Sequence, residues 1–164
     1  MEFAKLKDAQ VIAMDLNAHR LAFCKNSLGI SYIINGGDAD IITQLSEITS
    51  GEMPTVVIDA TGSRKAIQNG LHYLAHGGRY VLIGLQKDEM MFSHPEFHKK
   101  ETTLMSSRNA TRGDFEYVVA NMVSRKVNPR TFITTRVKFN DAAAGFPDWI
   151  NPTNHVIKVV VEKE

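Results

Sequence analysis

The sequence predicts an α/β fold in which a mostly parallel sheet is covered on both faces by helices. Short apolar runs alternate with longer segments of helical spacing along most of the chain, and this alternation is typical of parallel sheets. The early apolar runs are continuous rather than alternating with polar residues, as expected for strands buried on both faces.

The expected strands are short and mostly apolar. The first ends on an acid, the third runs into a glycine turn, and the fifth is more polar than the others. In chain order they cover residues 10–15, 30–35, 55–62, 79–85, 101–107, 130–139 and 155–163.

The expected helices lie between these strands and have recognisable ends. Gly29, Gly51 and the pair Gly77-Gly78 stop three of them, as glycine often does after the last helical turn. The segment 85–101 is long, charged and contains Pro95, so it reads as a surface loop or a short helix. The helices are expected over residues 3–6, 18–29, 38–51, 63–78, 112–126 and 141–150.

Composition places the chain among ordinary globular proteins. It has 164 residues, 43% of them apolar and 23% charged, which allows one sizeable core. The net charge of +1 favours neither nucleic acid nor a membrane surface as a partner. The single cysteine excludes a disulfide framework and a multi-cysteine zinc site within this chain, and a cytoplasmic location is the default expectation.

Asp15 is the first candidate binding residue, because it closes the run "VIAMD". A carboxylate at a strand end can accept both ribose hydroxyls of an adenosine and would repel a 2′-phosphate, which favours NAD over NADP. Arg20 follows about one helical turn later and could lie over the adenine. The alternatives are that Asp15 only caps the next helix and that Arg20 is a solvated surface residue.

Two further strand ends carry candidate contacts. "DATGS" (59–63) and "IGL" (83–85) follow neighbouring apolar strands, and ligands of open parallel sheets bind at the carboxyl ends of strands. Gly62 would let a ligand approach the backbone, and the backbone of "IGL" could bond a nicotinamide carboxamide. An ordinary strand-to-helix turn is the competing interpretation of "DATGS".

Three weaker signals complete the search for sites. His94 and His98 are four residues apart, but Pro95 between them and the lack of a third ligand favour a solvated loop over a metal site. Cys24 lies on an apolar helix face and is expected to be a small core residue. Arg108 ends a strand and is either a ligand contact or an ion-pair partner.

Four strings together resemble landmarks of the zinc-dependent medium-chain alcohol dehydrogenases. They are "VIAMD", "VVIDATGSRKAI", "LAHGGRYVLIGL" and "PEFHKKETTLMSSRNAT". The resemblance covers nearly the whole chain, in order, and is strongest to the polyol and sugar-acid branch of sorbitol-, threonine- and galactonate-dehydrogenase-like proteins. It implies a Rossmann-like doubly wound fold, NAD as cofactor and a polyol or sugar acid as substrate of the full-length protein.

The resemblance also implies roles for individual residues. Asp15 matches the ribose-binding acid and Arg20 the basic residue beside the adenine. Lys158 matches a basic residue near the pyrophosphate. The remaining matches flank the adenosine, hold the nicotinamide or lie near the substrate pocket; in that order they are Ala60 and Thr61, then Ile83 and Leu85, then Ser107 and Arg108.

Departures from the family pattern shape the functional expectation. The first strand and the glycine-rich loop of the nucleotide domain are lacking, and so is the catalytic domain that holds zinc. We therefore expect a truncated dinucleotide-binding domain over 1–130 and, over 131–164, a segment that in the family returns to the catalytic domain. The chain is expected to contain no catalytic or metal-binding residues, to be inactive alone, and to bind NAD weakly or not at all.

Assembly and alternative functions remain open at this point. The family resemblance implies a homodimer or larger oligomer that forms through the strand "TTLMSS". One alternative function is a non-catalytic module that binds adenosine, NAD or a protein partner. Another is a domain like the S-adenosylmethionine-dependent methyltransferases, whose second strand also ends in an acid.

Overall fold

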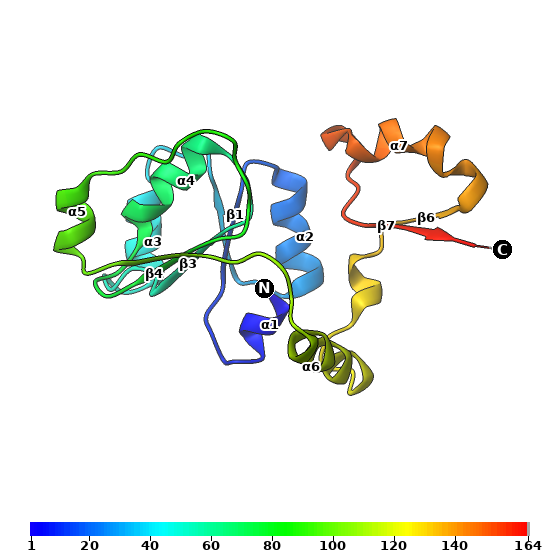
Figure 1. Ribbon diagram of the computed structural model, residues 1–164, viewed down its shortest axis with the longest axis horizontal. Helices are drawn as coiled ribbons and strands as arrows, with labels where there is room; N and C mark the ends of the chain where they lie inside the picture. Colours follow the sequence, from blue (N-terminus) through cyan, green and yellow to red (C-terminus); the bar gives the residue numbers. More distant parts are fainter. Residues whose placement is uncertain (164) are drawn as a thin grey trace. The chain divides into compact units, whose positions relative to one another are not determined.

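Strands and helices alternate in a computed structural model that describes residues 1–163 (Figure 1). The chain forms two compact units, one of residues 1–38 with 111–164 and the other of residues 39–110. Every strand pair in the described residues is parallel, as the sequence predicts. The strands form three separate sheets, ordered β1-β2, β3-β4-β5 and β6-β7. The expected division at residue 130 concerns the domains of a longer protein and stays a prediction.

The first part of unit 1 is a two-stranded parallel sheet with helix α2 packed on it. α1 (Glu2–Lys5) leads to β1 (Ile12–Asp15), α2 (Ala18–Leu28) and β2 (Tyr32–Asn35). α2 begins at the cap Asn17 and ends at Gly29, whose φ of +64° is the left-handed conformation that glycine adopts without strain.

A small core joins α2 to this sheet. Ala13, Cys24, Leu28 and Ile30 are buried together, so Cys24 is the small core residue that the sequence predicts. Burial raises the pKa of the Cys24 thiol above its ordinary value, and the nearby charge of Asp15 adds to the shift.

The second part of unit 1 contains a long helix and a second two-stranded sheet. Its elements are α6 (Arg112–Val123), a 3₁₀ helix (Pro129–Phe132), β6 (Thr135–Lys138), α7 (Ala142–Ile150) and β7 (Val159–Glu162). Phe132 packs against the core of α2, with its ring 6.1 Å from that of Phe23.

Unit 2 is a three-stranded parallel sheet with helices. Its elements are α3 (Ile41–Ile48), β3 (Val56–Asp59), α4 (Arg64–Gly70), β4 (Arg79–Leu82), α5 (His94–Lys99) and β5 (Thr103–Ser106). α4 is shorter than expected, because the chain tightens into a 3₁₀ helix at Leu71–Tyr73.

Tyr80 ties the middle strand of unit 2 to α4. It is fully buried, and its hydroxyl donates a 2.9 Å hydrogen bond to the carbonyl of Ile67. Burial raises the pKa of this hydroxyl, and the negative charge of Asp59 raises it further, so the hydroxyl keeps its proton and remains a donor. This bond fixes α4 over one face of the sheet.

Candidate functional site

The carboxyl end of β1 presents an exposed acid beside a base. Asp15 is the last residue of β1, and its side chain is 35% exposed. One carboxylate oxygen accepts the N–H of Asn17 at 2.9 Å, and the other lies 3.6 Å from Nη1 of Arg20. The structure therefore brings Asp15 and Arg20 together, as the sequence predicts, and leaves the carboxylate accessible to a ligand.

Asn17, rather than Asp15, is the cap of α2. Its side-chain oxygen accepts the N–H groups of His19 at 2.9 Å and Arg20 at 3.2 Å. The alternative interpretation of Asp15 as the helix cap is therefore wrong, because the loop between strand and helix contains one more residue suited to that role. Asp15 is left free for another function.

A hollow lies beside this group, within unit 1. It has a volume of about 270 Å³ and is lined by Asn17, His19, Arg20 and residues between 149 and 157. The ring of His19 stacks on that of His155 with their centroids 4.1 Å apart, and Asn17 donates to the carbonyl of Pro152 at 3.4 Å. Sequence reasoning missed this contact, because one sequence carries no signal that residues so far apart meet.

Lys158 follows the segment that lines this hollow. Its backbone carbonyl accepts the N–H of Thr134 at 3.0 Å, and its side chain is exposed just before β7. Three of the predicted contact residues, Asp15, Arg20 and Lys158, thus belong to unit 1.

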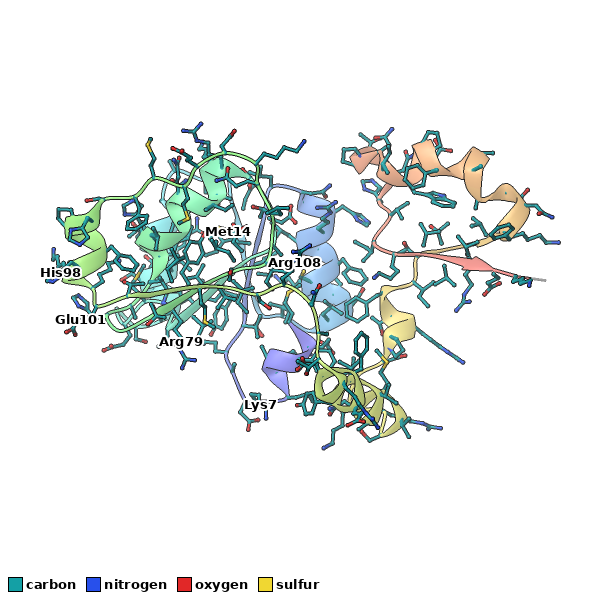
Figure 2. The ribbon with its side chains drawn as sticks, in the orientation of Figure 1. Lys7, Met14, Arg79, His98, Glu101 and Arg108 are labelled. Carbon is teal, nitrogen blue, oxygen red and sulfur yellow. The ribbon has the colours of Figure 1, made fainter. Side chains whose placement is uncertain are left out.

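The other predicted contact residues follow the three strands of unit 2. Asp59, Leu82 and Ser106 are aligned at the carboxyl ends of β3, β4 and β5, so the loops after them start at the same edge of the sheet. All six side chains are exposed, Ile83 at 54% and Leu85 at 91%. Arg108 lies in the extended segment after β5 (Figure 2). The predicted residues of this edge are Ala60, Thr61, Ile83, Leu85, Ser107 and Arg108.

Asp59 shapes the loop after β3 and is itself buried. Its carboxylate accepts the N–H of Thr61 at 2.9 Å and the hydroxyl of Thr61 at 3.0 Å. Its backbone carbonyl accepts the N–H groups of Ile83 and Gly84 at 2.8 and 3.0 Å. The Ile83 amide is thus used inside the loop, which leaves its carbonyl as the group that can meet a ligand.

Two glycines bring the loops after β3 and β4 into backbone contact. A Cβ on Gly84 would collide with the backbone N of Gly62. A Cβ on Gly62, whose φ is +65°, would lie 2.8 Å from the carbonyl oxygen of Leu85. The two loops therefore form one rigid lip, and glycine is needed on both sides of it.

The described residues contain no cluster that suggests a metal site. No group of three histidine, cysteine, aspartate or glutamate residues lies close enough to hold a metal ion within residues 1–163. His94 and His98 are exposed on α5 with ring centroids 5.9 Å apart. None of the helices in this part of the chain is long and apolar enough to cross a membrane.

These features define the class of the protein. Parallel strands alternate with helices, an acid closes β1, and exposed groups follow three aligned strand ends, as in doubly wound dinucleotide-binding domains. The family model for zinc-binding dehydrogenases matches residues 1–124. The chain belongs to the zinc-binding dehydrogenase family.

Similar proteins give the same result and show how much of them this chain covers. L-galactonate-5-dehydrogenase of Escherichia coli K12 is 36% identical over 158 residues, which are 96% of this chain and 46% of that protein. Probable D-xylulose reductase A of Neosartorya fischeri is 32% identical over 145 residues, 85% of this chain and 40% of the relative. The chain spans about half the length of the curated relatives it matches.

A solved structure shares the fold. An alcohol dehydrogenase of Escherichia coli CFT073, solved with the cofactor NADH, superposes with a TM-score of 0.87 at 23% identity. The superposition covers 98% of this chain and 47% of that one. The chain therefore has the fold of the nucleotide-binding half of alcohol dehydrogenases.

Proposed function

We propose that this chain is the nucleotide-binding half of an NAD-dependent, zinc-type alcohol, polyol or sugar-acid dehydrogenase, and that it is inactive by itself. The exposed carboxylate of Asp15 at the end of β1, 3.6 Å from Arg20, is the observation that carries the proposal. When bound, NAD would supply the hydride acceptor, and zinc held outside this chain would supply a Lewis acid.

Asp15 and Arg20 would hold the adenosine end of NAD. The carboxylate would accept the ribose hydroxyls and would repel a 2′-phosphate, so NAD is favoured over NADP. Arg20 is 54% exposed, which leaves its guanidinium free to lie against the adenine. Lys158 would place a positive charge near the pyrophosphate.

The loops at the edge of unit 2 would position the rest of the ligand. Ala60 and Thr61 would flank the adenosine, and the exposed Ile83 and Leu85 would place apolar surface and backbone groups against the nicotinamide. Ser107 and Arg108 would lie near the nicotinamide and the substrate. The rigid lip formed by Gly62 and Gly84 supports this role, because positioning groups act best on a fixed backbone.

Weak NAD binding follows from what these residues do not supply. No G-x-G-x-x-G pattern occurs in the sequence, and such a loop at a helix N-terminus is the usual cradle of the pyrophosphate. We expect adenosine-side contacts to persist while the contacts to the phosphates are largely lost. A non-catalytic module that had evolved to bind NAD would instead bind it tightly.

Calorimetry and a turnover assay test the proposal. AMP and NAD should bind this chain weakly and with similar affinity, and NADP more weakly still. Asp15→Asn should weaken both AMP and NAD at least about fivefold, because hydrogen bonds to a charged acceptor are lost. Asp88→Asn, in the exposed loop before α5, is the matched control and should change neither. Equal NAD affinity in the Asp15→Asn variant would contradict the proposed site.

The inactivity has its own assay. With NAD, zinc and galactonate or sorbitol, NADH should form no faster than without protein. Measurable zinc-dependent turnover would show that the chain carries catalytic groups that we assign elsewhere. We also infer a cytoplasmic protein that assembles as a homodimer or larger oligomer; the single, buried Cys24 supports the first inference and the outer edge of β5 the second.

A further inference from the structure

Strand β3 has one free edge. It pairs with β4 alone, while β4 pairs on its other side with β5, so β3 is an outer strand of its sheet among residues 1–163. An outer strand presents a row of backbone groups that another strand can bond. Parallel sheets are normally covered, so a free and apolar edge in one calls for an explanation.

The hydrogen-bond ladder shows which residues face this edge. The N–H of Arg79 donates to the carbonyl of Thr55 at 2.9 Å, and the N–H of Ile83 donates to that of Asp59 at 2.8 Å. Alternate residues of a parallel strand bond to the same neighbour, so residues 55, 57 and 59 face β4. The N–H and C=O groups of Val56 and Ile58 therefore point to the free edge.

The side chains of the same two residues are apolar and exposed. Val56 is 47% and Ile58 57% exposed. Met105, aligned with Ile58 through Val81, continues this exposed face on β5 at 45% exposure. Unpaired backbone and uncovered apolar side chains thus coincide at one edge.

The strand order indicates what fits there. Doubly wound sheets have the order 3-2-1-4-5-6. The sheets β2-β1 and β3-β4-β5 reproduce its two sides, with no described strand in the place of strand 1. L-galactonate-5-dehydrogenase also has 54% of its length outside the part that this chain matches, which is the complement of the 46% covered. A segment of polypeptide, rather than a small ligand, therefore suits the edge.

We propose that the free edge of β3 accepts an extended apolar strand that runs parallel to β3 and comes from a polypeptide outside these 164 residues. All strand pairs of unit 2 are parallel, so a parallel strand continues the existing ladder. Val56 and Ile58 would supply the backbone bonds and the apolar contact. The carboxyl end of the added strand would then lie beside Asp59 and Ala60.

Binding of such a strand can be measured with a synthetic probe. The probe is a fluorescein-labelled peptide, Lys-Thr-Val-Val-Ile-Val-Gly-Lys, and its control has two of the valines replaced by proline. Fluorescence anisotropy should show saturable binding of the probe and not of the control. Hydrogen exchange of the Val56 and Ile58 amides should slow when the probe is bound.

Two proline variants locate the site. In Ile58→Pro the removed N–H faces the free edge, so the β3–β4 ladder keeps its bonds. This variant should bind the probe at least about tenfold more weakly, since an edge hydrogen bond and an apolar contact are both lost. Ser106→Pro makes the same change on the outer edge of β5 and should bind the probe normally. Ile58→Lys, at an exposed position, is a second variant that should also weaken binding.

Several outcomes would overturn the proposal. They are no saturable binding, equal binding of the proline-containing control, and unchanged binding by Ile58→Pro and Ile58→Lys. Dissociation of an oligomer of this chain by Ile58→Pro would show that a second copy occupies the edge instead. Only the suggestion that the added strand ends beside the ligand site rests on the proposed function, and NAD calorimetry tests that function separately.

Discussion

Gly84 is the residue on which the geometry of the unit 2 edge depends most directly. Its Cα approaches the loop after β3 so closely that an added Cβ would lie 3.0 Å from the carbonyl carbon of Ala60 and would collide with the backbone N of Gly62. Backbone cannot move aside as a flexible side chain can. The two loops would have to separate to admit even one methyl group.

We therefore predict that Gly84→Ala destabilises the protein by about 1–3 kcal/mol, the usual cost of overpacking. Urea denaturation followed by circular dichroism measures this loss. Gly113→Ala is the control, because its Cβ would have only the Thr111 hydroxyl oxygen nearby, at 3.9 Å, and alanine favours a helix by about 0.5–1 kcal/mol over glycine. A Gly84→Ala protein as stable as the wild type would mean that the loops are not in contact.

Asp15 and His19 show what can be predicted at the scale of single residues. Asp15 is predictable because an acid that ends an apolar run is a local pattern, and the structure places it at the end of β1. His19 carries no such signal. Its contact with His155 depends on how the segment after α7 returns to α2, and that path is a tertiary property.

Helix α6 illustrates the same distinction at the scale of an element. Its start is set locally by Thr111 and Asp114, which form a capping box: each side chain bonds the backbone N–H of the other. The bonds from the N–H and the hydroxyl of Thr111 lower the pKa of the Asp114 carboxyl. This contribution is present above the ordinary pKa of the carboxyl and is lost as the pH falls through its lowered value.

Thr111→Ala should cost about 1 kcal/mol of stability at neutral pH, since an N-cap is lost. The loss, measured by urea denaturation, should shrink under acid conditions, where protonation of Asp114 weakens the capping box in the wild type as well. Thr43→Ala, at an exposed position within α3, is the matched control and should have little effect. A loss of the same size at every pH would show that Asp114 takes no part in the cap.

The apolar face of α6 was predicted, but its surroundings were not. Periodicity placed Phe115, Val119 and Val123 on one face, and the structure leaves them 63%, 55% and 78% exposed. The opposite side is the one that packs, with the Tyr117 ring 6.0 Å from that of Phe3. Helical spacing shows which residues share a face, but burial requires a second surface that the helix does not supply.

Assembly is a property of the whole molecule, and the outer edge of β5 is where we expect it. The N–H groups of Thr103 and Ser107 donate to β4-side carbonyls at 2.9 Å, so the backbone of Leu104 and Ser106 faces outward. Two copies related by a two-fold axis can pair these edges antiparallel.

Ser106→Pro should therefore shift the protein from dimer to monomer, because it removes an outward N–H without breaking the β4–β5 ladder. Sedimentation equilibrium measures the change in mass. Ile58→Pro should remain dimeric, which separates the β5 edge from the free edge of β3. A wild-type protein that is monomeric at high micromolar concentration would exclude this interface.

The sequence by itself determined the alternation of parallel strands and helices, the acid that closes β1, the glycine stops and the buried Cys24. These features arise from interactions between near neighbours and from the periodic burial of side chains, both of which are written locally. Only the tertiary structure decided that the strands form three separate sheets, that Val56 and Ile58 lie at a free edge, and that Gly62 meets Gly84. These depend on which surfaces meet across long stretches of chain, and that choice belongs to packing of the whole molecule rather than to any one segment.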